Sequence, residues 1–448
     1  MNPIVRTVLA LLFVAAVAIV LTIPLRGTES GSGPDPRVAS PSVLPSPSRT
    51  SLRFTLRPGS FPRSKRFAAR FPRTCLRPAQ PPAGDGLVAV VGRGRVAIAS
   101  LGGEEVASFR SRPPVAVSPS GGFVAAGPQG LMWTTDGESI AAANGEFQHG
   151  FVWQAKRGAW AWSPISDCGL SAERGQLLVS SADPQETSLG VTLLTRKVEA
   201  FAFSPDGREL GILTREAGPR SPASIWIADL TRSRMEEVRR FRRATCCITL
   251  GGWSPDGQHL FYWAASGNSV AADGWPLTSV TAAGARGNWG PTLTRPTVLE
   301  VCGDRLVGLT GGDRFQQGNR IAVLERGRQP RSLTARGSYG SLTCARSGAL
   351  IAASRSGRMV LFDGSGNFVR NLTTIATGNG ELTELSPDWG PPGTGILFIR
   401  QIHDTRQLWF LGEGAAAPNV VADVVLTGTH PLGTLFDWSA TPPAGLAN

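Results

Sequence analysis

The tetrapeptide Ser-Pro-Asp-Gly occurs twice in the chain, at residues 204–207 and 254–257, and weaker copies recur along most of its length. Successive copies are separated by about 40 to 52 residues. A repeat of this length is typical of a chain built from small β-sheets placed side by side, with one four-stranded sheet for each repeat. The copies begin at Ser118, Ser163, Ser204, Ser254, Gly303, Arg346, Ser386 and Trp438.

One repeat shows why these residues should form strands and a turn. Residues 200–203 alternate small and aromatic side chains, so one face of the predicted strand can pack against a neighbouring sheet. Pro205 fixes φ at the first corner of a turn, Asp206 can accept hydrogen bonds from nearby amides, and Gly207 tolerates a positive φ. Residues 210–214 are then predicted to form the returning strand.

The full repeat has a recognisable order: strand, turn, strand, loop, hydrophobic strand, and a short tail such as residues 331–334 (RSLT). This order resembles the WD40-like repeat of TolB-type propellers, and the resemblance covers about residues 85–443. It implies a closed β-propeller in which the repeated motif is a structural turn rather than an active site.

The number of blades follows from the same copies. Counting every copy gives eight four-stranded blades, discounting the weakest gives seven, and the arithmetic favours eight. Residues 87–110 form a partial first blade with no motif in front of it. We expect residues 434–438 to supply the missing strand and to close the ring.

Composition agrees with an all-β fold. The chain contains 54 Gly and 34 Pro, and no stretch after residue 30 keeps a helical period of 3.6. Residues 232–243 are the one ambiguous segment, since they fit either a short helix or an outer strand.

The amino terminus predicts a membrane anchor. Residues 7–25 are almost wholly apolar, and a helix of this length would be nearly long enough to cross a bilayer. The segment lacks the small-residue cleavage site of a signal peptide, so an uncleaved signal anchor over residues 1–26 is favoured over a cleaved signal and over a buried core helix. Because long domains translocate largely regardless of charge, we expect the propeller, residues 84–448, to lie outside the cytoplasm.

The net charge of +12 is concentrated before the propeller. Residues 1–83 carry a net charge of +10, so the remaining chain is nearly neutral and does not favour nucleic-acid binding. Residues 27–83 are rich in Pro, Ser and Arg and are predicted to form a disordered linker. Its arginines could contact anionic lipid or could simply keep the linker soluble.

Six cysteines leave the redox state open. Cys302 and Cys344 occupy similar places in neighbouring repeats, which makes them the candidate pair for a disulfide in an exported chain. Buried, unreactive thiols are the default interpretation of the six cysteines. Zinc has little support, because no C-x-x-C pair is present and the chain has only four His.

The sequence contains no motif typical of a catalytic, cofactor-binding or metal-binding site. Residues 92–97 spell G-x-G-x-x-A but are followed by a strand pattern, which favours a hairpin turn over a dinucleotide site. The turn residues Asp206, Asp256 and Asp388 recur once per blade, which favours turn capping over a shared Ca²⁺ site. We therefore predict no catalytic residue, cofactor or metal site.

Two groups of residues are candidates for binding a partner. The arginine cluster, residues 232–243, is the one local concentration of charge in the propeller, and it is either a solvated rim without function or a dock for an acidic partner. Three tryptophans are expected in Gly/Pro-rich loops, where an exposed ring could bind a sugar or peptide. These candidates are Arg232, Arg234, Arg239, Arg240, Arg242, Arg243, Trp275, Trp289 and Trp389.

These features lead to a functional hypothesis. The chain is expected to be a membrane-anchored, extracytoplasmic propeller of a bacterial cell envelope that binds a protein or an envelope polymer without catalysis. The alternative is a lactonase-like or glycan-cleaving hydrolase with its active site in the central channel, since propellers carry many functions. A third hypothesis makes the propeller a passive spacer in a membrane complex.

Overall fold

The structure is a computed structural model, and it divides into two compact units, Met1–Arg57 and Pro58–Asn448. All described residues belong to the second unit, so the expected anchor helix at residues 7–25 lies outside them. Within the part of the chain that is described, no helix is both long enough and apolar enough to span a bilayer. The described residues are 64–66, 71–80, 87–92, 94–111, 115–126, 131–134, 160–173, 176–181, 189–192, 197–216, 221–241, 247–265, 275–293, 299–312, 318–345, 347–372, 382–390, 394–402, 405–424 and 436–438.

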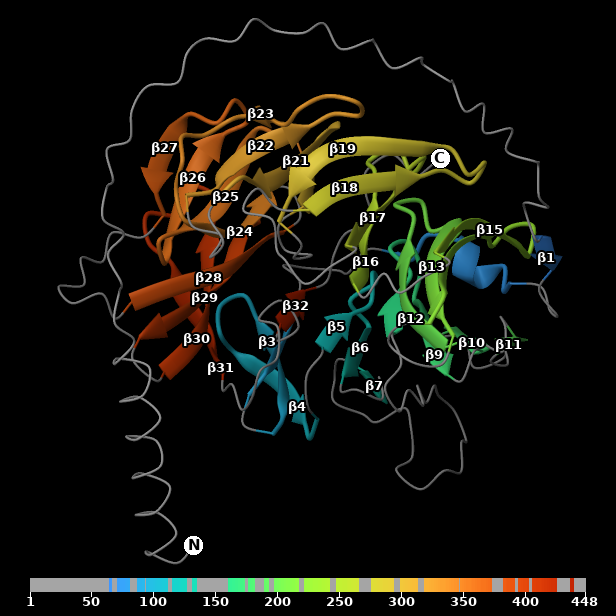
Figure 1. Cartoon of the computed structure of the whole chain (residues 1–448). Helices are drawn as coiled ribbons and strands as arrows, with labels where there is room; N and C mark the ends of the chain where they lie inside the picture. The colour runs from blue at the N-terminus through green and yellow to red at the C-terminus, as the bar shows by residue number, and fades with distance from the viewer. Residues whose placement is uncertain are drawn as a thin grey trace, which may run out of the picture. The chain divides into compact units, whose positions relative to one another are not determined.

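The described strands form eight antiparallel sheets, six of four strands, one of five and one of three (Figure 1). The first sheet contains β32 (Phe436–Trp438), β2 (Leu87–Val91), β3 (Val96–Ser100) and β4 (Glu105–Phe109). The second contains β5 (Val115–Val117), β6 (Phe123–Ala126) and β7 (Leu131–Thr134). The third contains β8 (Trp160–Trp162), β9 (Cys168–Glu173), β10 (Gln176–Ser181) and β11 (Leu189–Thr192).

The next three sheets follow in chain order. The fourth contains β12 (Lys197–Phe203), β13 (Glu209–Arg215), β14 (Ala223–Asp229), β15 (Arg234–Phe241) and, at its outer edge, β1 (Ser64–Arg66). The fifth contains β16 (Cys247–Trp253), β17 (Leu260–Ala265), β18 (Trp275–Val280) and β19 (Arg286–Thr292). The sixth contains β20 (Leu299–Cys302), β21 (Arg305–Thr310), β22 (Arg320–Leu324) and β23 (Arg331–Ser332).

Two more sheets complete the set. The seventh contains β24 (Tyr339–Cys344), β25 (Leu350–Arg355), β26 (Arg358–Asp363) and β27 (Phe368–Asn371). The eighth contains β28 (Leu382–Trp389), β29 (Gly395–Ile402), β30 (Thr405–Gly412) and β31 (Asn419–Val424).

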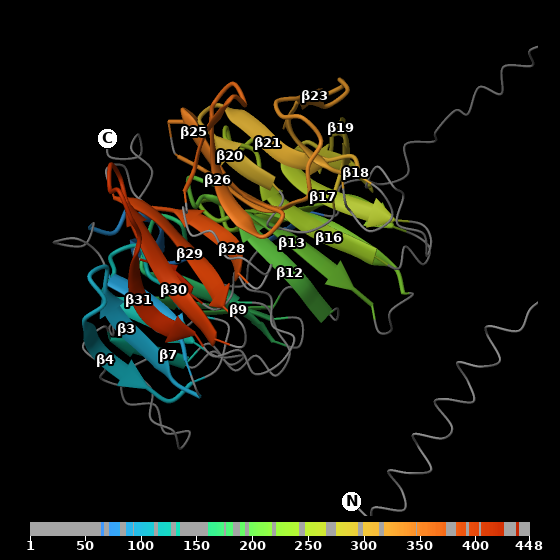
Figure 2. The ribbon, with the colours of Figure 1, turned by 90° about the vertical axis from the view of Figure 1, so that its left-hand side faces the viewer.

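The sheets form a closed ring. Each one contacts the next along the chain, as β12 contacts β16 and β24 contacts β28, and the eighth contacts the first through β31 and β3. Figures 1 and 2 both show β31 beside β3. The ring is also closed by the chain itself, because β32 pairs with β2 and places Trp438 opposite Val88. The expected closing strand is therefore confirmed for the residues described, 436–438.

Helical structure is minimal in the described residues. They contain no α-helix, and the short 3₁₀ helix η1 (Thr74–Leu76) is their one helical element. Of the two alternatives for residues 232–243, the structure has the outer strand, β15.

The Ser-Pro-Asp-Gly motif is a turn held by its own side chains, as predicted. The Ser204 hydroxyl donates a hydrogen bond to Asp206 Oδ1 at 2.6 Å and accepts one from the Glu209 amide at 2.9 Å. Asp206 Oδ1 also accepts from the amide of Arg208, and Gly207 has a φ of 66°. The second copy repeats these bonds through Ser254 and Asp256.

The same glycine is also a packing position, which leads to a first prediction. A Cβ on Gly207 would lie 2.7 Å from Ile165 Cγ1, in the corresponding turn of the preceding sheet, whereas at Gly327, with a φ of 74°, it would meet nothing within 4 Å. We expect Gly207→Ala to lower the free energy of unfolding by about 2 kcal/mol, from backbone strain and overpacking, and Gly327→Ala by about 1 kcal/mol, from strain alone. Urea unfolding of both variants checks this, and equal losses would contradict it.

The segment before the first sheet is folded onto the ring. β1 pairs with β15, with Ser64 opposite Glu236, and the Phe71 amide donates to Ser233 Oγ at 3.1 Å. Farther along, Cys75 is 1% exposed and forms a disulfide with Cys168 at a Cα–Cα distance of 5.3 Å. Residues 64–66 and 71–80, which fall within the linker expected over residues 27–83, therefore contact the fourth and third sheets.

A second disulfide joins neighbouring sheets near their inner edges. Cys302 ends β20 and Cys344 ends β24, and their Cα atoms lie 5.3 Å apart. These are the two cysteines that the sequence singled out as a pair. Beside them, Trp263 and Phe261 are fully buried in the core cluster that the fifth, sixth and seventh sheets share.

Candidate binding groove between the fourth and fifth sheets

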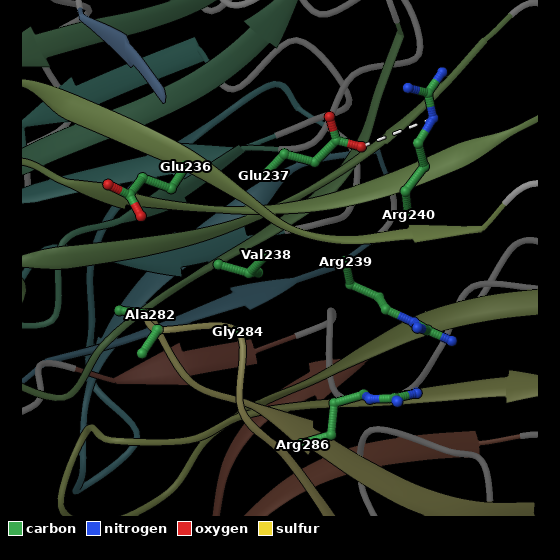
Figure 3. Close-up of a pocket in the computed structure, with 9 residues that line it drawn as sticks. Glu236, Glu237, Val238, Arg239, Arg240, Ala282, Gly284 and Arg286 are labelled. Atoms are coloured by element: carbon green, nitrogen blue, oxygen red, sulfur yellow. Dashed lines mark ion pairs between the residues drawn. The ribbon is translucent and has the colours of Figure 1, made fainter. Parts of the chain in front are cut away.

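A groove of about 320 Å³ opens between strand β15 of the fourth sheet and the β18–β19 hairpin of the fifth (Figure 3). Strand β15 forms one wall, and the turn between β18 and β19 forms the other. The lining residues are Glu236, Glu237, Val238, Arg239, Arg240, Ala282, Ala283, Gly284 and Arg286.

The backbone brings these two walls together. In β15, the pairing with β14 shifts by one residue at Val238, because Arg239 lies opposite Ile225 while Glu237 lies opposite Trp226. Such a bulge changes the direction of the side chains that follow it. Across the groove, Gly284 has a φ of 77°, and a Cβ there would lie 3.8 Å from the Val238 carbonyl oxygen. The glycine turn therefore lies directly against the bulge.

The acidic residues of the groove already have partners. Glu237 is 3% exposed and accepts a hydrogen bond from Ser224 Oγ at 2.8 Å. Arg240 lies 3.9 Å from this carboxylate and 3.7 Å from that of Glu216. Glu236 forms an ion pair with Arg234 at 2.6 Å. One end of the groove is thus close to neutral.

The other end carries two positive charges without an acidic partner. Among the described residues, neither Arg239 nor Arg286 forms an ion pair. Figure 3 shows their side chains extending in the same direction, away from Glu236. The Arg239 guanidinium lies 5.1 Å from the centre of the Phe241 ring, and its buried Nε finds no acceptor in the described structure.

A buried tyrosine, which does not itself line the groove, lies close to Arg239 and Arg286. Tyr262, on β17, is 3% exposed and its ring packs edge-on against Phe241. Burial raises the pKa of Tyr262 above its usual range, although the nearby Arg239 and Arg286 guanidinium groups and a hydrogen bond from Arg239 act in the opposite direction. The hydroxyl therefore stays protonated at neutral pH and can donate a hydrogen bond.

The structure separates the members of the predicted arginine cluster. Arg239 and Arg240 line the groove, whereas Arg234 pairs with Glu236, and Arg232 is exposed and lies 3.5 Å from Asp229 Oδ2. Arg242 and Arg243 lie outside the described residues. Sequence reasoning missed Arg286 and Tyr262, because they come from strands of the next repeat and no local pattern links them to β15.

The expectation that three tryptophans lie in loops is wrong. Trp275 begins β18, Trp289 lies in β19 and Trp389 ends β28, and all three are half-buried against core clusters. Trp289 donates to Ser279 Oγ at 2.9 Å. The glycines and prolines around them suggested loops, but β19 includes Gly287, Gly290 and Pro291 within a paired strand. Their role in binding a partner stays a prediction.

Two carboxyl groups on inner strands interact in the part of the chain that the structure describes. Burial, with Asp388 as a second cause, raises the pKa of Glu300 to about 8. Glu300 lies on β20 and Asp388 on β28, the first strands of the sixth and eighth sheets. Within the ranges described, no three His, Cys, Asp or Glu side chains gather as metal ligands would.

Comparison with solved structures confirms the propeller fold. Dihydro-heme d1 dehydrogenase NirN in complex with DHE matches with a TM-score of 0.53 and 14% identity, over 80% of this chain and 77% of that one. A protein assigned as TolB from Agrobacterium tumefaciens gives a TM-score of 0.31 and 15% identity, over 61% of this chain and 84% of that one. An acylaminoacyl peptidase gives a TM-score of 0.42 and 10% identity, over 79% of this chain and 54% of that one.

These likenesses concern the fold alone. At 14% identity the NirN match establishes a shared β-propeller architecture and carries no activity to this chain. No protein-family model matches the sequence, and the search of curated proteins finds no match.

Proposed function

We propose that the chain is a non-catalytic binding scaffold, and that the groove between β15 and the β18–β19 turn is its binding surface for an acidic group of an envelope protein or polymer. One observation carries this proposal: Arg239 and Arg286 lie together at one end of the groove with no acidic partner among the described residues. Two uncompensated like charges repel each other, so an anionic partner gains affinity by relieving that repulsion.

The location of the scaffold is part of the proposal. We place it outside the cytoplasm, attached to the membrane through residues 7–25, whose apolar run has nearly the length of a transmembrane helix. Two disulfides support this location, because disulfides persist mainly in oxidising compartments.

We further propose that each of the eight sheets is one blade, so that the propeller has eight. The second sheet has three described strands rather than four, and residues 135–159, which follow it in the chain, lie outside the described residues. An experimental structure that shows a fourth strand from this segment would support eight full blades.

Site-specific crosslinking tests the binding function. A photoreactive residue replaces Glu236 at the rim of the groove, and a control replaces the exposed Asn367 in the turn before β27. In native membranes, we expect a discrete product from the groove position only, lost when Arg239 and Arg286 are both changed to glutamate. Identical products from both positions, or a product that survives the charge reversal, would contradict the proposal.

A hydrolase with a site in the central channel is a second candidate, favoured by the Glu300 and Asp388 pair. A carboxyl group with a pKa near 8 beside a second carboxyl group is the arrangement that separates a general acid from a base or nucleophile. Turnover of a glycan or lactone that Glu300→Gln abolishes would favour this candidate over the scaffold.

A further inference from the structure

Two arginines from different strands line the positive end of the groove, and a buried tyrosine lies close to both. Arg239 lies on β15, Tyr262 on β17 and Arg286 at the start of β19. The Tyr262 hydroxyl accepts a hydrogen bond from Arg239, and both guanidinium groups lie close enough to act on its pKa. Arg239 and Arg286 are 47 positions apart along the chain, and the fold places their guanidinium groups at the same end of the groove.

Hydrogen-bond accounting shows an excess of donors there. A tyrosine hydroxyl that accepts from arginine still has its own proton to donate, and each guanidinium carries five N–H donors and no acceptor. Neither Arg239 nor Arg286 forms an ion pair among the described residues. An anion with several oxygens would supply acceptors for the guanidinium donors that face the groove.

The donors are also held in place before any ligand binds. Tyr262 is fixed in the core between the two sheets, edge-on to Phe241 at a centroid distance of 5.8 Å. The Arg239 guanidinium lies over the same Phe241 ring. Because these side chains are already held in place, binding a ligand costs less side-chain entropy.

We propose that Arg239 and Arg286 form a binding site for a phosphate monoester, with Tyr262 holding Arg239 in position, and this inference rests on the binding function proposed for the groove. A carboxylate carries one charge and would compensate one arginine. A phosphate monoester carries a charge of about −1.5 to −2 near neutral pH and has three acceptor oxygens. It therefore matches two guanidinium groups that approach from different strands.

The test measures binding of defined anions to the full chain in detergent. Glycerol phosphate and acetate are titrated at equal ionic strength by isothermal calorimetry. We expect glycerol phosphate to bind at least about tenfold more tightly than acetate. Arg239→Gln and Arg286→Gln should each weaken it by about tenfold or more, and Tyr262→Phe by about fivefold, as expected for lost hydrogen bonds to a charged group.

A matched variant separates this site from general charge. Arg232→Gln also removes one positive charge near β15, but Arg232 is exposed and already lies beside Asp229, so affinity should change less than about twofold. Thermal unfolding of each variant shows whether it is folded, and Tyr262→Phe keeps the packed ring. Equal affinity for acetate and phosphate, or an equal loss in Arg232→Gln, would overturn the proposal.

Nanodiscs distinguish a lipid source from a soluble one. If a phosphorylated lipid is the ligand, nanodiscs with phosphatidic acid should compete with glycerol phosphate, whereas nanodiscs of phosphatidylcholine should not. If neither phosphatidic acid nor glycerol phosphate binds through Arg239 and Arg286, the phosphate proposal is wrong. The crosslinking experiment then decides separately whether the groove binds another acidic group.

Discussion

Replacing Cys75 and Cys168 together with serine is expected to lower the free energy of unfolding by about 4 kcal/mol. The disulfide joins residues 93 positions apart. In the unfolded chain it closes a loop of that length. The resulting loss of conformational entropy destabilises the unfolded state by about 4–5 kcal/mol. In the folded chain it holds residues 71–80 against the third sheet, where the Ala79 amide donates to the Ile165 carbonyl oxygen at 2.6 Å. Urea unfolding of the full chain under oxidising conditions measures the loss.

The second disulfide provides the matched control. Cys302 and Cys344 are 42 positions apart, so the Cys302→Ser, Cys344→Ser variant should lose about the same free energy of unfolding. The two variants should differ in hydrogen exchange. Only loss of the Cys75 disulfide should speed exchange where β1 pairs with β15, because that segment then opens locally. Unchanged exchange there, or a loss below about 1 kcal/mol, would contradict this account.

The second large effect concerns pH and Glu300. Its pKa is about 8 in the folded chain, against an ordinary value of 4.5. Between these values the unfolded chain releases this proton while the folded chain keeps it, so the free energy of unfolding falls as pH rises. The limiting slope for one group is about 1.4 kcal/mol per pH unit. Because the residue keeps part of its exposure, we expect Glu300 to account for a loss of about 3 kcal/mol between pH 5 and 8.

Two variants isolate this contribution. Glu300→Gln cannot ionise, so its unfolding free energy should exceed that of the original chain by a margin that grows as pH rises from 5 to 8. Asp388→Asn removes the second cause of the raised pKa and should reduce the dependence on pH without abolishing it. Urea unfolding at several pH values checks both. If the difference between the original chain and Glu300→Gln stays constant with pH, Glu300 is not the titrating group.

Local features of the fold could be predicted because their physical causes lie close together in sequence. The turn at residues 204–207 needs a proline, an acceptor and a glycine within four positions, and its bonds run between residues at most five apart. Alternating side chains in the same repeats indicated the strands on either side. The closing strand could also be predicted, because a first repeat without its own motif must obtain one strand from elsewhere.

Features that depend on distant contacts could not be predicted in the same way. Residues 71–80 carry no strand pattern, and they are ordered by Cys168 and by Ile165 in a sheet that follows much later in the chain. The groove depends on a bulge at Val238 and a glycine turn at Gly284 that belong to different repeats. The sequence indicated the arginines of β15, but only the fold places Arg286 and Tyr262 beside them.

The pairing of β32 with β2 has a consequence for how the protein is made. Val88 and Val90 are fully buried in the finished ring, yet their partner strand, Phe436–Trp438, is synthesised much later than β2 itself. Until those residues emerge, β2 is an edge strand with unpaired backbone groups, which is a template for aggregation. Contacts over such a sequence separation also form slowly. A chain that stops short of Phe436 should therefore be captured by chaperones or degraded rather than accumulate as a smaller propeller.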